Sequence, residues 1–136
     1  MNMALLSLMG FAVWGIILGL SIVSWRGVLV LRGTTRVNDF PSGERHGPDL
    51  YWRLNRAHLN TIENLPIMAT VIFVAWAAGT ITPFVESLAQ WAFVARLLQS
   101  LAHISSNSAL AVSARVTFLS IQYCCFAGIA YLAAFK

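Results

Sequence analysis

The sequence predicts an all-α integral membrane protein, built as a bundle of four transmembrane helices in up-down order. Hydrophobic residues make up 58% of the 136 residues and charged residues only 10%, whereas soluble domains carry about 25% charged residues. The mean hydropathy is +0.71. Polar segments separate four apolar runs, each long enough to cross a hydrocarbon core of about 30 Å. Because the chain is short, we expect residues 1–136 to form a single membrane domain.

The first apolar run, residues 3–25, predicts a helix that continues to Leu31. At about 1.5 Å per residue it is long enough to cross the bilayer. It exceeds the apolar region of a signal peptide, and it lacks the basic cluster and the A-x-A-like cleavage site that such a peptide carries. We therefore expect a membrane helix, followed by a loop that is rich in glycine, proline and charge.

The three remaining helices follow from capping residues and chain breaks. We expect the second helix over residues 50–79, with Asp49 as its N-cap because a carboxylate accepts an orphan backbone N–H. "GTITP" breaks the chain, and Pro83 fits the first turn of a third helix over residues 83–104. After the "SSNS" turn, a fourth helix covers residues 109–135. One long and two short connections favour an up-down bundle.

The basic residues predict the orientation in the membrane. A chain with four spans has both termini on one side, and the first loop and the "SSNS" turn on the other. Loops rich in arginine stay in the cytoplasm. We therefore expect a multi-pass protein of a bacterial inner membrane, with its arginine-rich loops on the cytoplasmic side. Since these arginines link apolar runs, we expect no nucleic-acid partner. Six of the nine basic residues lie in this region: Arg26, Arg32, Arg36, Arg45, Arg53 and Arg56.

The two cysteines, Cys124 and Cys125, are neighbours in an apolar stretch. A metal site needs more ligands than these two residues provide, and adjacent cysteines rarely pair with each other. We therefore expect no metal, and we interpret both residues as small lipid-facing or core side chains.

The densest polar cluster is "RLNRAHLNTIENLP", residues 53–66. On a helical wheel, five of its polar side chains fall within an arc of about 100°, whereas His58 lies off this arc and is expected to pack or hydrogen-bond between helices. Charges inside a membrane cost roughly 2.5–3.5 kcal/mol each, so they normally face a bundle interior or an aqueous cavity. The five residues, which we call the polar stripe, are Arg53, Arg56, Asn60, Glu63 and Asn64.

The polar stripe has two interpretations. In the first, Arg56 and Glu63 neutralise each other in a buried ion-pair network that Asn60 bridges. In the second, the stripe lines a ligand pocket. Its two arginines outnumber its one glutamate, and the surplus positive charge suits a zwitterionic ligand with more negative than positive groups. The carboxylate binds an amine, while the guanidiniums bind carboxylates in bidentate fashion.

Further polar residues align with this pocket. Arg115 adds a cation near the start of the fourth helix, and Arg32 and Arg36 are expected to close the site from the cytoplasmic side. The alternative for each arginine taken singly is an interfacial side chain whose guanidinium reaches the headgroups. The third helix also aligns a charge with hydrogen-bonding groups on one face: Arg96, Gln99, Ser100 and His103.

Residues 53–66 resemble the second-helix signature of the membrane-associated proteins in eicosanoid and glutathione metabolism (MAPEG), which include microsomal glutathione transferases. The resemblance covers essentially the whole chain, and the second helix is its most specific part. It implies a homotrimer of four-helix protomers that bind glutathione between neighbouring subunits near the cytoplasmic side. The pattern R-x-x-R-A-H-x-N-x-x-E-N-x-P is matched by Arg53, Arg56, Ala57, His58, Asn60, Glu63, Asn64 and Pro66.

The resemblance also implies roles for individual residues. Glu63 takes the γ-glutamyl amine of glutathione, and Arg115 corresponds to the catalytic arginine that stabilises the thiolate. The well-studied synthases have a tyrosine where His103 stands, and a shorter gap before the catalytic arginine. The residues expected to bind glutathione are Arg32, Arg53, Arg56, Asn60, Glu63, Asn64, Arg96, Gln99 and His103.

The function that the resemblance implies is that of a membrane-embedded, glutathione-dependent transferase or peroxidase of the detoxification type. Glutathione is the co-substrate, and a guanidinium lowers the pKa of its thiol, because the thiolate is the nucleophile. The lipophilic substrate enters from the membrane lipids. Two alternatives stay open: a non-catalytic member that binds lipids or a protein partner, and a bundle with a purely structural ion network. The thiol is glutathione or another cellular thiol.

Overall fold

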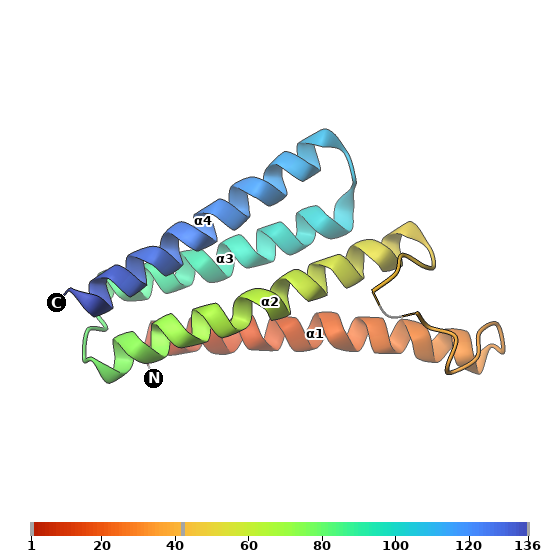
Figure 1. The fold of residues 1–136 in the computed structure, drawn as a ribbon, viewed down its shortest axis with the longest axis horizontal. Coiled ribbons are helices and arrows are strands. Elements are labelled where there is room, and N and C mark those ends of the chain that lie inside the picture. The colour runs from red at the N-terminus through yellow and green to blue at the C-terminus, as the bar shows by residue number, and fades with distance from the viewer. Residues whose placement is uncertain (1, 42, 136) are drawn as a thin grey trace.

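The computed structural model describes residues 2–41 and 43–135. Four helices follow one another in the order α1 (Met3–Leu31), α2 (Asp49–Ala77), α3 (Pro83–Ser105) and α4 (Ala109–Ala134). Figure 1 shows the start of α1, the end of α4 and the α2–α3 connection at one end of the bundle, which we call the terminus end. The α1–α2 loop and the α3–α4 turn lie at the other, which we call the loop end. The predicted all-α up-down bundle is confirmed.

Polar side chains cap three of the four helices, as exposed backbone N–H groups at a helix start require. Each of these side chains accepts a hydrogen bond from the backbone N–H three residues further along the chain. Pro83 occupies the first turn of α3, as the sequence predicts. The three capping residues are Asn2, Thr82 and Ser108.

The predicted capping role of Asp49 is wrong. Helix α2 begins at Asp49 itself, and Pro48 occupies the N-cap with an extended backbone and no side-chain cap hydrogen bond. Because Asp49 lies inside the first turn, its carboxylate forms an ion pair with Arg45, four residues earlier. A negative charge in the first turn also interacts favourably with the helix dipole.

Three helices, α1, α2 and α4, are long and apolar enough to cross a membrane. Helix α3 has 23 residues, and its length of roughly 34 Å also exceeds the hydrocarbon core. Its lower hydropathy comes from polar side chains such as Arg96 and Gln99, which are buried inside the bundle. Exposed residues of α3 include Phe84, Trp91 and Leu101. The face of α3 that meets lipid is therefore apolar, and α3 is the fourth span.

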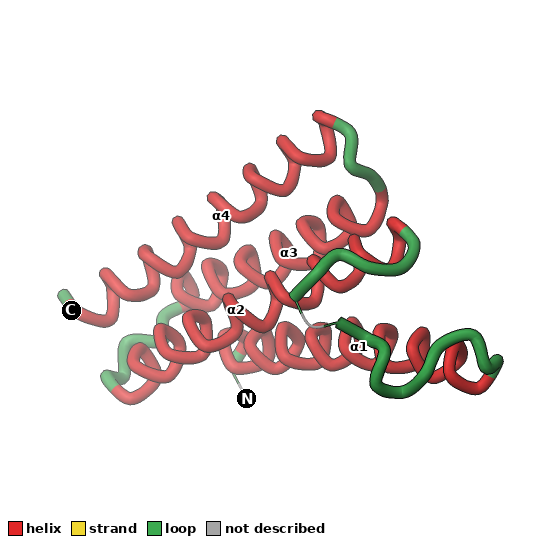
Figure 2. Tube along the Cα trace, turned by 45° about the vertical axis from the view of Figure 1, so that its right-hand side comes forward, coloured by secondary structure: helices red, strands yellow, loops and turns green. Residues whose placement is uncertain are grey.

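Helices α2 and α3 form the centre of the bundle, and α1 and α4 lie on the outside. Helix α3 packs against the other three, whereas α1 and α4 do not contact each other within the described residues. These two outer helices diverge toward the loop end (Figures 1 and 2). A Cβ atom at Gly19 of α1 would lie 3.1 Å from His58 Cε1 of α2. His58 therefore packs on α1, in agreement with its position off the polar stripe.

The interior of the bundle has an apolar half and a polar half. The apolar half lies toward the terminus end and includes Phe11, Met68, Ile72, Phe126 and Ile129. Cys125 is buried in it, while Cys124 is exposed. Toward the loop end, buried polar residues from three helices replace the apolar ones: Asn64, Arg96, Gln99, Ser100, His103 and Gln122.

Candidate functional site: an arginine pocket at the loop end

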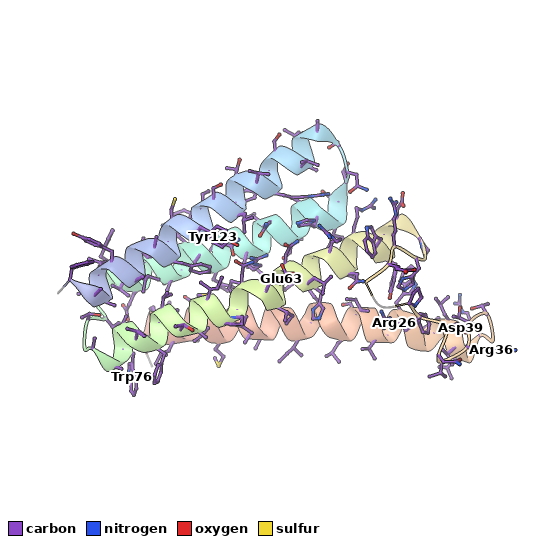
Figure 3. All side chains as sticks on the ribbon, viewed as in Figure 1. Arg26, Arg36, Asp39, Glu63, Trp76 and Tyr123 are labelled. Atoms are coloured by element: carbon purple, nitrogen blue, oxygen red, sulfur yellow. The ribbon has the colours of Figure 1, made fainter. Side chains whose placement is uncertain are left out.

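The α1–α2 loop is tied to both helices that it connects. Arg26 Nε, on α1, donates a hydrogen bond to Tyr51 Oη of α2 at 2.7 Å. The Arg26 guanidinium also lies over the Phe40 ring of the loop, with Cζ 5.2 Å from the ring centroid, a distance that permits a cation–π interaction. Figure 2 shows the loop folding back from α1 toward the start of α2, and Figure 3 labels Arg26 beside it. His46, next to Arg45, lies against the Tyr51 ring with the ring centroids 5.2 Å apart, so the segment that carries Arg45 packs on the start of α2.

A pocket of about 270 Å³ lies at the loop end, where the α1–α2 loop, α2 and the α3–α4 turn meet. Four of its lining residues are arginines and none is acidic. Guanidinium groups bind carboxylates in a planar, bidentate arrangement, so the pocket suits a ligand with several anionic groups. We call it the arginine pocket; its lining residues are Arg45, Trp52, Arg53, Arg56, His103, Asn107 and Arg115.

Two of these arginines bind the carbonyl groups at the end of α3. Arg53 Nε donates to the Ile104 carbonyl oxygen at 3.0 Å. Arg115 Nε donates to the Ala102 carbonyl oxygen at 3.3 Å, and Arg115 Nη2 donates to that of Ser106. The last carbonyls of a helix have no partner within the helix, and cations near them are favoured by the helix dipole. Both arginines thus stabilise the end of α3 and line the pocket.

Asn60 connects α2 to the histidine of the arginine pocket. Its Nδ2 donates to the Arg56 carbonyl oxygen at 2.9 Å and lies 3.1 Å from His103 Nε2 on α3. His103 is 8% exposed. Asn64, one turn deeper, donates through Nδ2 to the Asn60 carbonyl oxygen at 2.8 Å.

The polar stripe lies at the edge of the buried face of α2. Asn64 is buried, Arg53 and Asn60 are half-buried, and Arg56 and Glu63 are exposed. Figure 3 labels Glu63 on α2 beside α3. Within residues 2–41 and 43–135 the ion pair that forms is Arg45–Asp49, not Arg56–Glu63. The proposed internal ion pair of the stripe is therefore absent from the described protomer.

A second polar group lies deeper, in the polar half of the interior. Arg96 is fully buried, and its Nη2 donates to Gln122 Oε1 of α4 at 2.8 Å. Gln122 Nε2 in turn donates to Gln99 Oε1 at 3.0 Å. The guanidinium also lies over the Phe11 ring, with Cζ 5.3 Å from the centroid. Arg96 Nε and Nη1 have no hydrogen-bond partner among the described residues. This network joins α1, α3 and α4.

The predicted site residues therefore fall into four places. Arg53, Arg56, His103 and Arg115 line the arginine pocket, and Asn60 contacts it through His103. Glu63 is exposed on α2, beside α3 (Figure 3). Arg32 is exposed at the C-cap of α1 and lines a separate groove with Ser21 and Ser24. Asn64, Arg96 and Gln99 are buried in the polar half.

Sequence reasoning missed four residues. Arg45, Trp52 and Asn107 line the pocket, but two of them belong to connections whose folding no helical periodicity predicts. Gln122 is an isolated amide in an apolar span, and this is a usable signal, since a buried amide in a membrane requires a partner.

Comparison with known proteins agrees with this architecture. The sequence profile of the MAPEG family matches residues 4–135. No curated protein sequence matches the chain significantly. The match covers all four membrane helices, the arginine pocket and the polar half of the interior. The chain belongs to the MAPEG family, a family of membrane proteins in eicosanoid and glutathione metabolism.

Proposed function

We propose that this protein is a glutathione-dependent transferase or peroxidase that activates the glutathione thiol for attack on lipophilic electrophiles. The observation that carries the proposal is the arginine pocket, in which four guanidiniums converge at one end of a membrane bundle without an acidic lining residue. Family membership supports glutathione as the ligand class.

The charges of glutathione match those of the site. Glutathione has two carboxylates, one amine and one thiol. Arg53 and Arg56 of the pocket bind its carboxylates, and Glu63, about two to three turns away on the same helix, binds its amine. Asn64, Arg96 and Gln99 support this arrangement from the polar half of the interior.

Arg115 supplies the catalytic positive charge. The thiolate is the reactive form of a thiol, and a neighbouring guanidinium lowers the pKa of the thiol. Arg115 Nη1 remains available, because the hydrogen bonds to α3 use Nε and Nη2. The electrophile dissolves in the bilayer and reaches the sulfur between helices, so the membrane concentrates one substrate and the arginine pocket recruits the other.

A neighbouring copy of the chain completes the site. Arg56 and Glu63 are exposed on the protomer, and charged groups exposed to lipid are costly. Arg32 lies on an outer helix, away from the pocket of its own chain. In the homotrimer that the family resemblance implies, Arg32 of one copy reaches the ligand held by α2 of the next. The loop end faces the cytoplasm, in keeping with its many arginines.

A second candidate function is non-catalytic binding of a lipid or protein partner. One observation favours it: Arg115 donates to several carbonyl groups at the end of α3, so a structural role alone accounts for this arginine. In that case the arginine pocket binds an anionic ligand without activating a thiol.

Thiolate formation tests the proposal directly. Purified protein in detergent is mixed with glutathione, and the ultraviolet absorbance of the thiolate is recorded; S-hexylglutathione, which has no free thiol, is the control ligand. We expect a thiolate signal with glutathione alone. Binding of both ligands without a thiolate signal supports the non-catalytic candidate, and absence of glutathione binding refutes the transferase or peroxidase proposal.

A further inference from the structure

The contact between Asn60 and His103 determines which nitrogen of the histidine carries the proton. An amide nitrogen donates hydrogen bonds and cannot accept them. Asn60 Nδ2 lies 2.9 Å from the Arg56 carbonyl oxygen. A carbonyl oxygen can only accept a hydrogen bond, so the amide atom that faces it is the nitrogen and not Oδ1. The reversed amide would place two oxygens against each other. The second hydrogen of the same amide group therefore points to His103 Nε2, 3.1 Å away.

The hydrogen bond from Asn60 leaves His103 with a free donor. Nε2 must carry a lone pair to accept it, so the proton of the neutral imidazole resides on Nδ1. Nδ1 has no hydrogen-bond partner among residues 2–41 and 43–135. It is not fully buried either, so a ligand can reach it. His103 lines the arginine pocket together with Arg56 and Arg115, beside which a positively charged imidazole is repelled.

From this geometry we propose that Asn60 is a positioning residue: it holds His103 as the Nδ1–H tautomer, and His103 then donates this N–H to an anionic group of the ligand in the arginine pocket. The anionic group is the thiolate or a carboxylate. This ligand step rests on the proposed function, whereas the tautomer does not. In this proposal Asn60 does not donate a hydrogen bond to the ligand itself, because both hydrogens of its amide group are already used within the protein.

The tautomer is measured first, on the full chain without ligand. Nitrogen NMR of protein labelled with ¹⁵N-histidine distinguishes protonated from unprotonated ring nitrogens, and a His103→Gln variant assigns the signals. We expect Nδ1 protonated and Nε2 unprotonated. Asn60→Asp, which offers only acceptors, should move the proton to Nε2. Asn55→Ala, on the same helix and without a side-chain hydrogen bond to any residue of 2–41 and 43–135, is the matched control. A proton on Nε2 in the wild type overturns the proposal.

Ligand binding is measured second. His103→Leu should weaken glutathione binding about tenfold or more, as expected for a lost hydrogen bond to a charged group. Asn60→Ala should weaken glutathione binding by no more than His103→Leu does. The double variant Asn60→Ala/His103→Leu should bind glutathione no more weakly than His103→Leu alone. Independent, multiplying losses identify Asn60 as a direct ligand residue and overturn its positioning role.

S-hexylglutathione separates the two possible anionic groups. It keeps both carboxylates but has no thiolate. If His103→Leu leaves its affinity unchanged, His103 contacts the thiolate; an equal loss for both ligands assigns the contact to a carboxylate. If the wild-type protein has the expected tautomer but does not bind glutathione, the proposed function and the ligand step are refuted. The role of Asn60 in setting the tautomer of His103 is then still supported.

Discussion

Arg96 and Gln122 join α3 to α4 through a hydrogen bond of 2.8 Å in the membrane interior. Gln122 Nε2 passes the connection on to Gln99. A buried guanidinium in such a site depends on its partners, because a charged group without them keeps the full desolvation cost. Gln122, one of the four residues that the sequence did not predict, is thus the hydrogen-bond partner of the most deeply buried charge.

Replacing Gln122 should therefore destabilise the bundle. We expect Gln122→Leu to lower the free energy of unfolding by about 1.5–3 kcal/mol, the range for a lost hydrogen bond to a charged group. The double variant Arg96→Met/Gln122→Leu should be more stable than Gln122→Leu, because an apolar pair removes the stranded cation. Thermal unfolding in detergent measures both. A double variant that is less stable than Gln122→Leu contradicts this account of the network.

Glu63 distinguishes a ligand residue from a structural ion-pair partner. Because Glu63 is exposed and forms no ion pair within the described protomer, Glu63→Gln should leave the midpoint of thermal unfolding nearly unchanged. Glutathione affinity should fall by about 1.5–3 kcal/mol, measured by calorimetric titration. A stability loss of about 3–5 kcal/mol instead indicates that Glu63 neutralises a buried cation.

Arg115 separates a catalyst from a binding protein. Arg115→Ala should reduce turnover of a model electrophile with glutathione at least about tenfold, which corresponds to about 1.4 kcal/mol of lost thiolate stabilisation. Glutathione affinity should stay within a few fold. Ser113→Ala, an exposed change on the same helix, is the control for general effects on α4. Turnover at the wild-type level in Arg115→Ala removes this residue from the mechanism.

The orientation in the membrane is testable with introduced cysteines. Glu44→Cys, in the α1–α2 loop, and Ala134→Cys, at the end of α4, lie at opposite ends of the bundle (Figure 1). A membrane-impermeant thiol reagent should label them from opposite faces of sealed vesicles, with position 44 on the cytoplasmic face. The wild-type protein, treated in the same way, is the control for labelling of Cys124 and Cys125. Labelling of both positions from one face is incompatible with four spans.

Assembly is the remaining expectation. Exposed charged groups on α2 and uncovered outer faces on α1 and α4 predict association with neighbouring copies, and the family resemblance implies three. We expect a homotrimer in mild detergent, which native mass spectrometry measures directly. Glu63→Gln should keep this assembly if Glu63 serves the ligand. Monomers alone in the wild type argue against a site shared between neighbouring copies.

The sequence by itself determined the helices and most of their ends. Apolar runs of sufficient length predict the spans, and local features such as Pro83 predict where a helix begins. These features depend on neighbours in the chain. The one wrong cap, Asp49, shows the limit: its carboxylate had a competing partner in Arg45, and two acceptable local arrangements differ by little energy.

Helical periodicity also predicted which polar residues share a face, because side-chain direction repeats along a helix. It predicted that Arg96, Gln99 and His103 align, and all three are buried. It did not predict their partners. Whether Asn60 meets His103, or Gln122 meets Arg96, depends on the rotation and height of one helix relative to another.

Those quantities come from packing, and only the tertiary structure decided them. The approach of α1 to α2 at Gly19 and His58, and the anchoring of the loop by Arg26 and Tyr51, set how the helices meet. Together with the hydrogen bonds from Arg53 and Arg115 to the end of α3, these contacts bring Arg45 of the loop and Arg115 of α4 to a single pocket, although 70 positions separate them in the sequence. Periodicity describes a single helix, whereas a pocket between helices is a property of their contacts.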